Sequence, residues 1–181
     1  MIIIPYLIVK QKYRRKKALR LLRIPIISSN AIITNKMKLI KRLQDHYPNI
    51  VFKAGEENLW LPNKKTIIFR PSDEIGLLHE LGHALCGHTD FNQDIELLHA
   101  ERDAWDKAVE LSKIYGVNMD ENRIETAMDW YRNWLHARSL CPECGQNGIQ
   151  QRSTGNYKCL NCATIWQSSD ARMKELRRHK L

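Results

Sequence analysis

The stretch KTIIFRPSDEIGLLHELGHALCGH, residues 65–88, joins a strand pattern to a helix pattern and carries a metal-binding motif on the helix. Residues 65–70 are predicted as a strand because β-branched and aromatic side chains follow one another there. A helix is expected next, with Ser72 as its N-cap, acidic residues in its first turn and Gly87 at its C-terminal end. The apolar residues of this helix recur at helical spacing, which predicts one buried face.

His79-Glu80-Leu81-Gly82-His83 is an H-E-x-x-H motif within the predicted helix. Two residues four positions apart lie on one helix face, about 6 Å apart along the axis, so one zinc ion can bind both imidazoles. Glu80 follows the first ligand directly, where its carboxylate can take a proton from a water that the metal polarises. The motif predicts metal-assisted hydrolysis with Glu80 as general base. The alternative is two surface histidines and a solvated glutamate.

A third ligand is expected because catalytic zinc usually takes three protein groups and leaves one position for water. Residues 94–115 read as a long amphipathic helix with Glu101 in the middle of its apolar stripe. A buried carboxylate is costly unless it meets a cation, and zinc would be that cation. The alternative partner for Glu101 is an arginine or lysine at the edge of the core. Glu96 and His99 fall on the face that water would solvate.

Two residues at the end of the motif helix have less definite roles. His88 lies five residues after His83, beyond the predicted helix end. It could contact substrate, stabilise a developing oxyanion or cap the turn, and a capping or solvated histidine is the more frequent case. Cys86 falls on the apolar side of the helix, so we expect a buried thiol that packs like a small hydrophobe.

Four of the five cysteines form two C-x-x-C knuckles, Cys141 with Cys144 and Cys159 with Cys162. Their spacing, across a polar and glycine-containing segment, predicts a zinc ribbon that holds a structural zinc ion with four thiolates. Disulfides are the alternative. They are disfavoured because no signal-peptide pattern precedes the knuckles and Cys86 leaves an odd number of cysteines. We therefore expect a cytoplasmic protein.

The motif block and the helix that follows it resemble a known family. The block His79 to His88, followed by a helix that contains Glu101-Arg102-Asp103-Ala104-Trp105, resembles the ImmA/IrrE family of zinc metallopeptidases over about residues 38–138. The resemblance implies zinc ligands at His79, His83 and Glu101 and a catalytic base at Glu80. It implies an endopeptidase that cleaves a protein substrate, such as a transcriptional repressor of a mobile element or a stress regulator.

The chain departs from that family in one respect. Members often carry a helix-turn-helix domain, and no segment before the motif reads as one. A weaker resemblance, to SprT-like proteins, rests on the combination of an H-E-x-x-H helix with a zinc ribbon. Those proteins use a later histidine as the third ligand, and this chain has no evident equivalent.

Charge is unevenly distributed along the chain, whose formal net charge is +9. Residues 1–44 contain twelve lysines and arginines and no acidic residue, so the whole positive excess originates there. Residues 1–9 are apolar but too short to span a bilayer, and they precede the basic residues, unlike a signal peptide. Residues 10–23 could form a basic amphipathic helix that contacts a membrane surface or nucleic acid. We predict no transmembrane segment.

The ribbon suggests a second class of function. Basic residues surround it, and Tyr157 and Trp166 lie within it. Basic groups with aromatic rings can bind a nucleic-acid backbone and stack bases. The alternative to a peptidase is therefore a nucleic-acid-binding zinc-ribbon protein with an inactive zincin-like domain. The same basic groups could hold a protein substrate or form a solvated tail.

The expected fold is α+β: a small zincin-like helical domain with a short β-sheet, followed by the four-cysteine zinc ribbon. Strand candidates at residues 50–53 and 65–70 provide the sheet, and a third helix is expected over residues 119–138. A helix that opens at Met37 and ends before Pro48 marks the start of the domain. The extension before it could be poorly ordered or reflect an upstream translation start. The expected segments are a basic extension (1–36), the zincin-like domain (37–139), the ribbon (140–168) and a basic tail (169–181).

Overall fold

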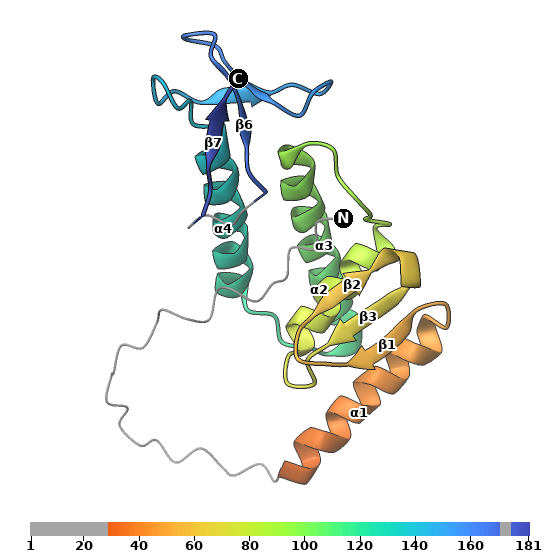
Figure 1. Ribbon diagram of the computed structural model, residues 1–181. Coiled ribbons are helices and arrows are strands. Elements are labelled where there is room, and N and C mark those ends of the chain that lie inside the picture. Colours follow the sequence, from red (N-terminus) through yellow and green to blue (C-terminus); the bar gives the residue numbers. More distant parts are fainter. Residues whose placement is uncertain (1–28, 171–174) are drawn as a thin grey trace, which may run out of the picture.

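The structure, a computed structural model, describes residues 29–170 and 175–181, with side chains in the first helix from Lys38 onward. It has a mixed α+β architecture with helices and two small sheets (Figure 1). The elements in chain order are α1 (Ser29–His46), β1 (Val51–Ala54), β2 (Leu59–Leu61), η2 (Pro62–Lys64), β3 (Thr66–Phe69), α2 (Glu74–Leu85), α3 (Asp94–Tyr115), α4 (Glu121–Ser139), β4 (Gly148–Gln150), β5 (Tyr157–Cys159), β6 (Ile165–Ser168) and β7 (Arg178–Lys180).

Two predictions for the N-terminal region concern residues that the structure does not describe. The apolar residues 1–9 and the basic helix predicted over residues 10–23 lie outside the described residues. Within the described part of the chain, no helix has the length and apolarity needed to cross a membrane.

The first sheet has the strand order β1-β3-β2. Strands β1 and β3 are parallel, in the register Phe52 to Ile67, and β2 pairs antiparallel with β3, in the register Trp60 to Ile67. Phe52, Ile67 and Phe69 are buried in the core, as alternating strand positions require. Strand β2 is an edge strand of this sheet, and both β2 and β3 contact α2.

Helix α1 ends at His46, before Pro48 as predicted, but it begins at Ser29 and not at Met37. The prediction of Met37 rested on the amphipathic pattern, which marks where a helix packs and not where it starts. No proline or glycine lies between Ile26 and Met37, so the backbone can remain helical before the packed turns. From Lys38 onward, Leu39 and Leu43 anchor the helix in the core.

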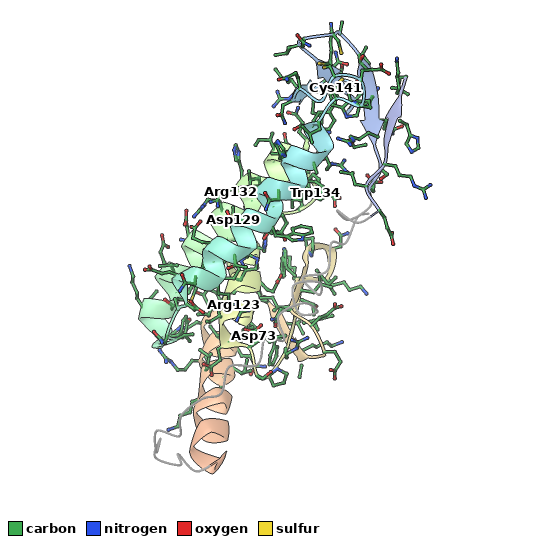
Figure 2. The ribbon with its side chains drawn as sticks, turned by 90° about the vertical axis from the view of Figure 1, so that its left-hand side faces the viewer. Asp73, Arg123, Asp129, Arg132, Trp134 and Cys141 are labelled. Carbon is green, nitrogen blue, oxygen red and sulfur yellow. The ribbon has the colours of Figure 1, made fainter. Side chains whose placement is uncertain are left out.

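Helix α2 is capped by Asp73, one residue later than the predicted Ser72. The Asp73 Oδ1 atom accepts a hydrogen bond of 3.0 Å from the Gly76 amide. Asp73 also accepts two bonds of 2.7 and 2.8 Å from the Arg123 guanidinium and one of 2.8 Å from Asn58 Nδ2. Figure 2 shows Asp73 and Arg123 against each other. Asp73 caps the helix in place of Ser72 because its carboxylate satisfies the helix N-terminus, the Arg123 guanidinium and the Asn58 amide together.

Helix α2 ends at Leu85 with Cys86 at its C-cap, and the predicted Gly87 is the residue at which the chain turns away. Gly87 has a φ of +71°, a left-handed conformation that costs little only for glycine. The amide of His88 then donates to the His83 carbonyl at 3.0 Å, and that of Gly87 donates to the Ala84 carbonyl at 3.3 Å. This pair of bonds is a Schellman motif. It turns the chain sharply and brings residue 88 back beside residue 83.

Helices α2 and α3 pack closely. A Cβ atom at Gly82 would collide with the Ala104 carbonyl, so the contact requires glycine at this position. Trp105, one residue further along α3, is fully buried. Helix α3 runs from Asp94 to Tyr115, the predicted bounds, and Gly116 ends it with a φ of +72°. The close approach brings the middle of α3 against the motif face of α2.

The ribbon sheet has the order β4-β5-β6-β7, with all neighbouring strands antiparallel. Strand β7 lies within the segment expected to be a basic tail, so the sheet extends beyond residue 168. The ribbon is joined to the helices by a buried network. Asp94, at the start of α3, contacts the Arg138 guanidinium and accepts a hydrogen bond of 2.7 Å from the Tyr157 hydroxyl. The amide of Asp94 also donates to Gln150 Oε1 at 2.7 Å.

Candidate metal centres

Three side chains from α2 and α3 converge on one point. His79 Nε2 lies 3.1 Å from His83 Nε2 and 3.2 Å from Glu101 Oε2, and His83 Nε2 lies 3.6 Å from Glu101 Oε1. Tetrahedral zinc with bonds of about 2.0–2.1 Å would hold its ligand atoms about 3.3 Å apart. These three ligand atoms could therefore hold a metal ion. The arrangement brings together the three residues that the sequence predicted as ligands.

The packing of α2 on α3 explains this convergence. Glu101 is buried on the core side of α3, where its ion pairs are with the two histidines. The His79 ring stacks on Trp105 with 4.0 Å between ring centroids and an interplanar angle of 29°. The environment of Glu101 thus favours the cation-site interpretation over a salt bridge to a core-edge arginine or lysine.

The two buried glutamates of the site have opposite electrostatic environments. Burial raises the pKa of Glu80, and the neighbouring imidazoles only partly offset this effect. Burial also favours the neutral form of Glu101, but its bonds to His79 and His83 outweigh that cost and hold its pKa below the usual range. Glu101 is therefore suited to act as an ionised ligand, whereas Glu80 is suited to accept a proton.

Glu80 is held by the edge strand. Its Oε2 atom accepts a hydrogen bond of 2.8 Å from the backbone amide of Trp60 in β2. The Trp60 indole donates in turn to the His88 carbonyl at 3.1 Å. Sequence reasoning missed Trp60, because a main-chain donor leaves no residue-type signal.

His88 points toward the metal-ligand cluster. Its Nδ1 atom lies 3.0 Å from His83 Nδ1, and its Nε2 atom lies 4.0 Å from Asp103 Oδ2. Its backbone amide caps α2, which agrees with the capping role considered from the sequence. Burial and the adjacent His83 lower the pKa of His88. The side chain also borders the cleft beside the cluster.

A cleft of about 780 Å³ opens beside the three ligands. Its walls come from β2, η2, α2, the loop after α2, α3 and Tyr131 of α4. Glu96 and His99 also border it, but they are not among the side chains that converge on the metal point. Glu96 accepts bonds from the amides of Asn92 and Gln93, so it caps α3. The cleft is large enough for part of an extended peptide.

The expectation for Cys86 is wrong, because its thiol is exposed. Helix α2 ends at Leu85, and Cys86 lies at the C-cap where the chain begins to turn. Cys86 keeps helical backbone angles, with φ −77° and ψ −6°, so its exposure reflects the position of the helix end at the protein surface and not a change of helical phase. Leu85, the residue before it, is also exposed.

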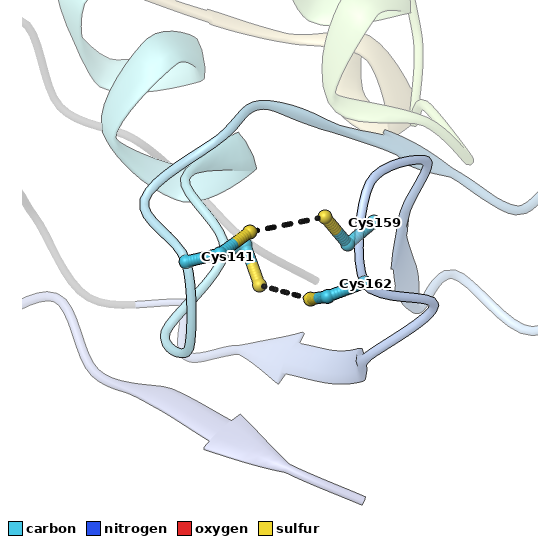
Figure 3. A group of neighbouring side chains, drawn as sticks. Cys141, Cys159 and Cys162 are labelled. Carbon is cyan, nitrogen blue, oxygen red and sulfur yellow. Dashed lines mark hydrogen bonds between the residues drawn. The ribbon is translucent and has the colours of Figure 1, made fainter.

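The four ribbon cysteines form a second cluster (Figure 3). Cys141 Sγ lies 3.6 Å from Cys162 Sγ, and Cys144 Sγ lies 3.5 Å from Cys159 Sγ. A disulfide would place two sulfurs about 2.05 Å apart, whereas tetrahedral zinc places them about 3.8 Å apart. All four are free thiols. The cluster could bind a metal ion such as zinc, as the spacing predicted.

The aromatic residues of the ribbon are not available as a binding surface. Tyr157 is 2% exposed and Trp166 is 0% exposed, and their rings stack inside the ribbon with centroids 5.4 Å apart. The expectation that they offer aromatic surface is therefore wrong. Two basic side chains of β7 are also engaged: Arg178 donates to the carbonyls of Ala137 and Leu140, and Lys180 pairs with Glu143. The ribbon presents fewer free nucleic-acid-binding groups than its composition suggests.

No protein-family model, curated protein or solved structure matches the chain. The resemblance to ImmA/IrrE peptidases thus rests on the motif block and on the helix that contains Glu101, and membership of that family stays a prediction.

Proposed function

We propose that the protein is a zinc-dependent endopeptidase. The observation that carries the proposal is the convergence of two imidazoles and one carboxylate on a point that borders a cleft, with a second buried carboxylate beside them. This donor set fits zinc, which accepts nitrogen and carboxylate ligands and keeps a fourth position for solvent in catalytic sites. His79, His83 and Glu101 would hold the ion.

The chemistry divides among the residues of the cleft. Bound zinc would supply Lewis acidity that polarises water and the scissile carbonyl. Glu80 takes the proton from the attacking water as the new carbon–oxygen bond forms, and it then gives that proton to the leaving amine as the amide bond breaks. The raised pKa of Glu80 brings the carboxyl group closer to the range in which it both accepts and releases a proton. The backbone amide of Trp60 fixes one of its oxygens and leaves the other for this transfer.

A protein substrate fits the shape of the site. Strand β2 is at the edge of the first sheet and forms one wall of the cleft. An extended peptide can add to such an edge through main-chain hydrogen bonds, here to groups of β2 other than the Trp60 amide, which donates to Glu80. The resemblance to ImmA/IrrE peptidases adds the proposal that the substrate is a transcriptional repressor or another regulator.

The ribbon has a structural role in this proposal. Four thiolates fill the coordination sphere of a zinc ion, so its site offers no position for water. The metal would stabilise the short strands of the ribbon, whose core consists of a few buried side chains. A protein with both sites loaded would carry one catalytic and one structural zinc ion.

Zinc content and peptide cleavage together test the proposal. We expect two zinc ions per chain in the wild type and in Glu80→Gln, and one in Glu101→Ala. Cleavage of a proteome-derived peptide library, followed by mass spectrometry of new termini, should fall about 10²-fold or more in Glu80→Gln, the scale of general-base catalysis. One zinc ion in the wild type would overturn the catalytic site. Two ions without Glu80-dependent cleavage would overturn the peptidase while leaving the metal site intact.

A further inference from the structure

His88 has a position that neither a turn cap nor a solvated side chain requires. Its backbone amide alone completes the turn after α2, yet its ring points back at His83. We propose that His88 is a positioning residue: its Nδ1 atom accepts a hydrogen bond from His83 Nδ1–H and so fixes the orientation and tautomer of that metal ligand. This inference rests on the proposed metal site.

The backbone of His88 is held on both sides. Its amide donates to the His83 carbonyl at 3.0 Å, and its carbonyl accepts from the Trp60 indole at 3.1 Å. The rings of His83 and His88 are 5.1 Å apart at an interplanar angle of 69°, and their Nδ1 atoms are separated by 3.0 Å. The side chain of His88 is 18% exposed. The ring is therefore built into the site and does not merely border it.

The direction of the hydrogen bond follows from the ligand role of His83. Its Nε2 atom faces His79 Nε2 and Glu101 Oε1, so this nitrogen must keep its lone pair for a metal ion. The neutral ring then carries its proton on Nδ1, which lies against His88 Nδ1. That atom must act as the acceptor, and the proton of His88 resides on Nε2. The Nε2 edge faces the Asp103 carboxylate at 4.0 Å, which favours this tautomer electrostatically.

The two histidine ligands are thus oriented by different means. The His79 ring is set by stacking on the buried Trp105. His83 lies nearer the cleft, where its ring has no comparable stacking partner among the described aromatic contacts and meets His88 edge to face. A hydrogen bond to the second ring nitrogen is a common way to fix a metal-bound imidazole. Two flanking contacts of different kinds therefore hold the pair in register with Glu101.

Two substitutions separate the hydrogen bond from packing. His88→Phe keeps a ring of similar shape and removes the acceptor, so zinc affinity at the histidine site should fall about 10–100-fold. His88→Asn places the acceptor atom Oδ1 near the position of Nδ1, so we expect zinc affinity within about threefold of the wild type. Affinity is measured by chelator competition in the full chain with the ribbon site loaded. His99→Phe, at another cleft histidine, is the matched control.

Spectroscopy adds a readout that does not depend on activity. In the cobalt-substituted protein, the visible absorption bands of the histidine site should change in His88→Phe and be restored in His88→Asn. Wild-type affinity and spectrum in His88→Phe, or equal losses in both variants, would overturn the positioning role. If His88→Phe fails to fold by circular dichroism, His88→Ala replaces it in the same comparison. Absence of a second zinc ion from the wild type would instead overturn the proposed function.

Discussion

At the scale of single residues, the site depends on the different pKa shifts of two glutamates, Glu80 and Glu101. Both are buried near the two imidazoles, but Glu101 forms ion pairs with them, whereas for Glu80 their charge only partly offsets the cost of burial and its hydrogen bond comes from the Trp60 amide. Opposite pKa shifts follow from this difference. Neighbouring carboxyl groups whose environments separate their pKa values are typical of acid–base sites.

Exchange of Glu101 for glutamine tests the ligand assignment more finely than alanine. Glutamine keeps the shape of the side chain but cannot supply a charged oxygen, so zinc affinity at the histidine site should fall by at least about tenfold while the ribbon zinc stays bound. Metal titration followed by mass spectrometry of the intact protein distinguishes the two sites. An affinity for the second zinc ion equal to the wild-type value would exclude Glu101 as a ligand.

The sequence singled out the three candidate ligands because each occupies a place where its chemistry conflicts with its surroundings. A glutamate in an apolar stripe, or two histidines one turn apart, is detectable without coordinates. Trp60 and Asp73 were not predicted in their roles. Trp60 acts through its main chain, which every residue type shares, and Asp73 competes with the adjacent Ser72 for the same cap position.

At the scale of elements, the contact between α2 and α3 determines the geometry of the site. Gly82 allows the α2 backbone to approach the Ala104 carbonyl, and Glu101 lies one turn before that contact. The sequence predicted both helices, but not their separation, because a glycine within a helix does not specify what approaches it. The same limit applies to Cys86, because its helical spacing does not show which neighbours cover the end of α2.

Gly82→Ala should separate the two helices. A methyl group there meets backbone atoms that cannot move independently, so we expect about 1–3 kcal/mol of destabilisation and weaker zinc binding at the histidine site. Urea unfolding of the apo and zinc-loaded protein measures both effects. Gly87→Ala, where a Cβ meets no neighbouring atom but the φ is positive, is the contrasting variant. It should reduce stability through backbone strain alone.

The cap of α2 gives a pH-dependent prediction. Burial favours the neutral form of Asp73, but the hydrogen bonds from Arg123 and Gly76 outweigh it and lower its pKa. Because the pKa of Asp73 is lower in the folded than in the unfolded protein, the ionised carboxylate stabilises the fold at pH values above the unfolded pKa of about 4. This stabilisation is lost as the pH falls through the folded-state pKa. Asp73→Asn should therefore cost about 1–3 kcal/mol at pH 7 and progressively less below pH 4.

Urea denaturation at a series of pH values measures this difference. Asp129→Asn is the control, because the pair of Asp129 with Arg132 is exposed on α4 and should contribute little at any pH. A destabilisation by Asp73→Asn that did not change between pH 7 and pH 3 would contradict the ionic contribution.

At the scale of the whole molecule, the ribbon is attached to the helices through buried polar groups. Arg138 contacts Asp94, and its carbonyl accepts bonds of 3.0 Å from both Trp166 Nε1 and Ser168 Oγ. The sequence separated a ribbon from a helical domain but did not predict this junction. The residues of the junction are far apart along the chain, and the sequence around each one does not indicate which residue it contacts.

Arg138→Met should be strongly destabilising because it leaves the Asp94 carboxylate buried without its cation. We expect a loss of about 3–5 kcal/mol, and the double variant Asp94→Asn with Arg138→Met should recover part of it. Thermal unfolding monitored by tryptophan fluorescence measures both. Additive losses in the double variant would show that the two side chains are not coupled.

The order of the candidate metal ligands along the chain has a consequence for biosynthesis. His79, His83 and Glu101 all lie on α2 and α3, which are neighbours in sequence, whereas the ribbon cysteines begin forty residues later, at Cys141. A nascent chain grows from its N-terminus at about 5–20 residues per second, and contacts between adjacent helices form quickly. The histidine site therefore emerges from the ribosome several seconds before the first knuckle. In a cell with little available zinc, the histidine site would therefore be able to bind an ion before the ribbon cysteines.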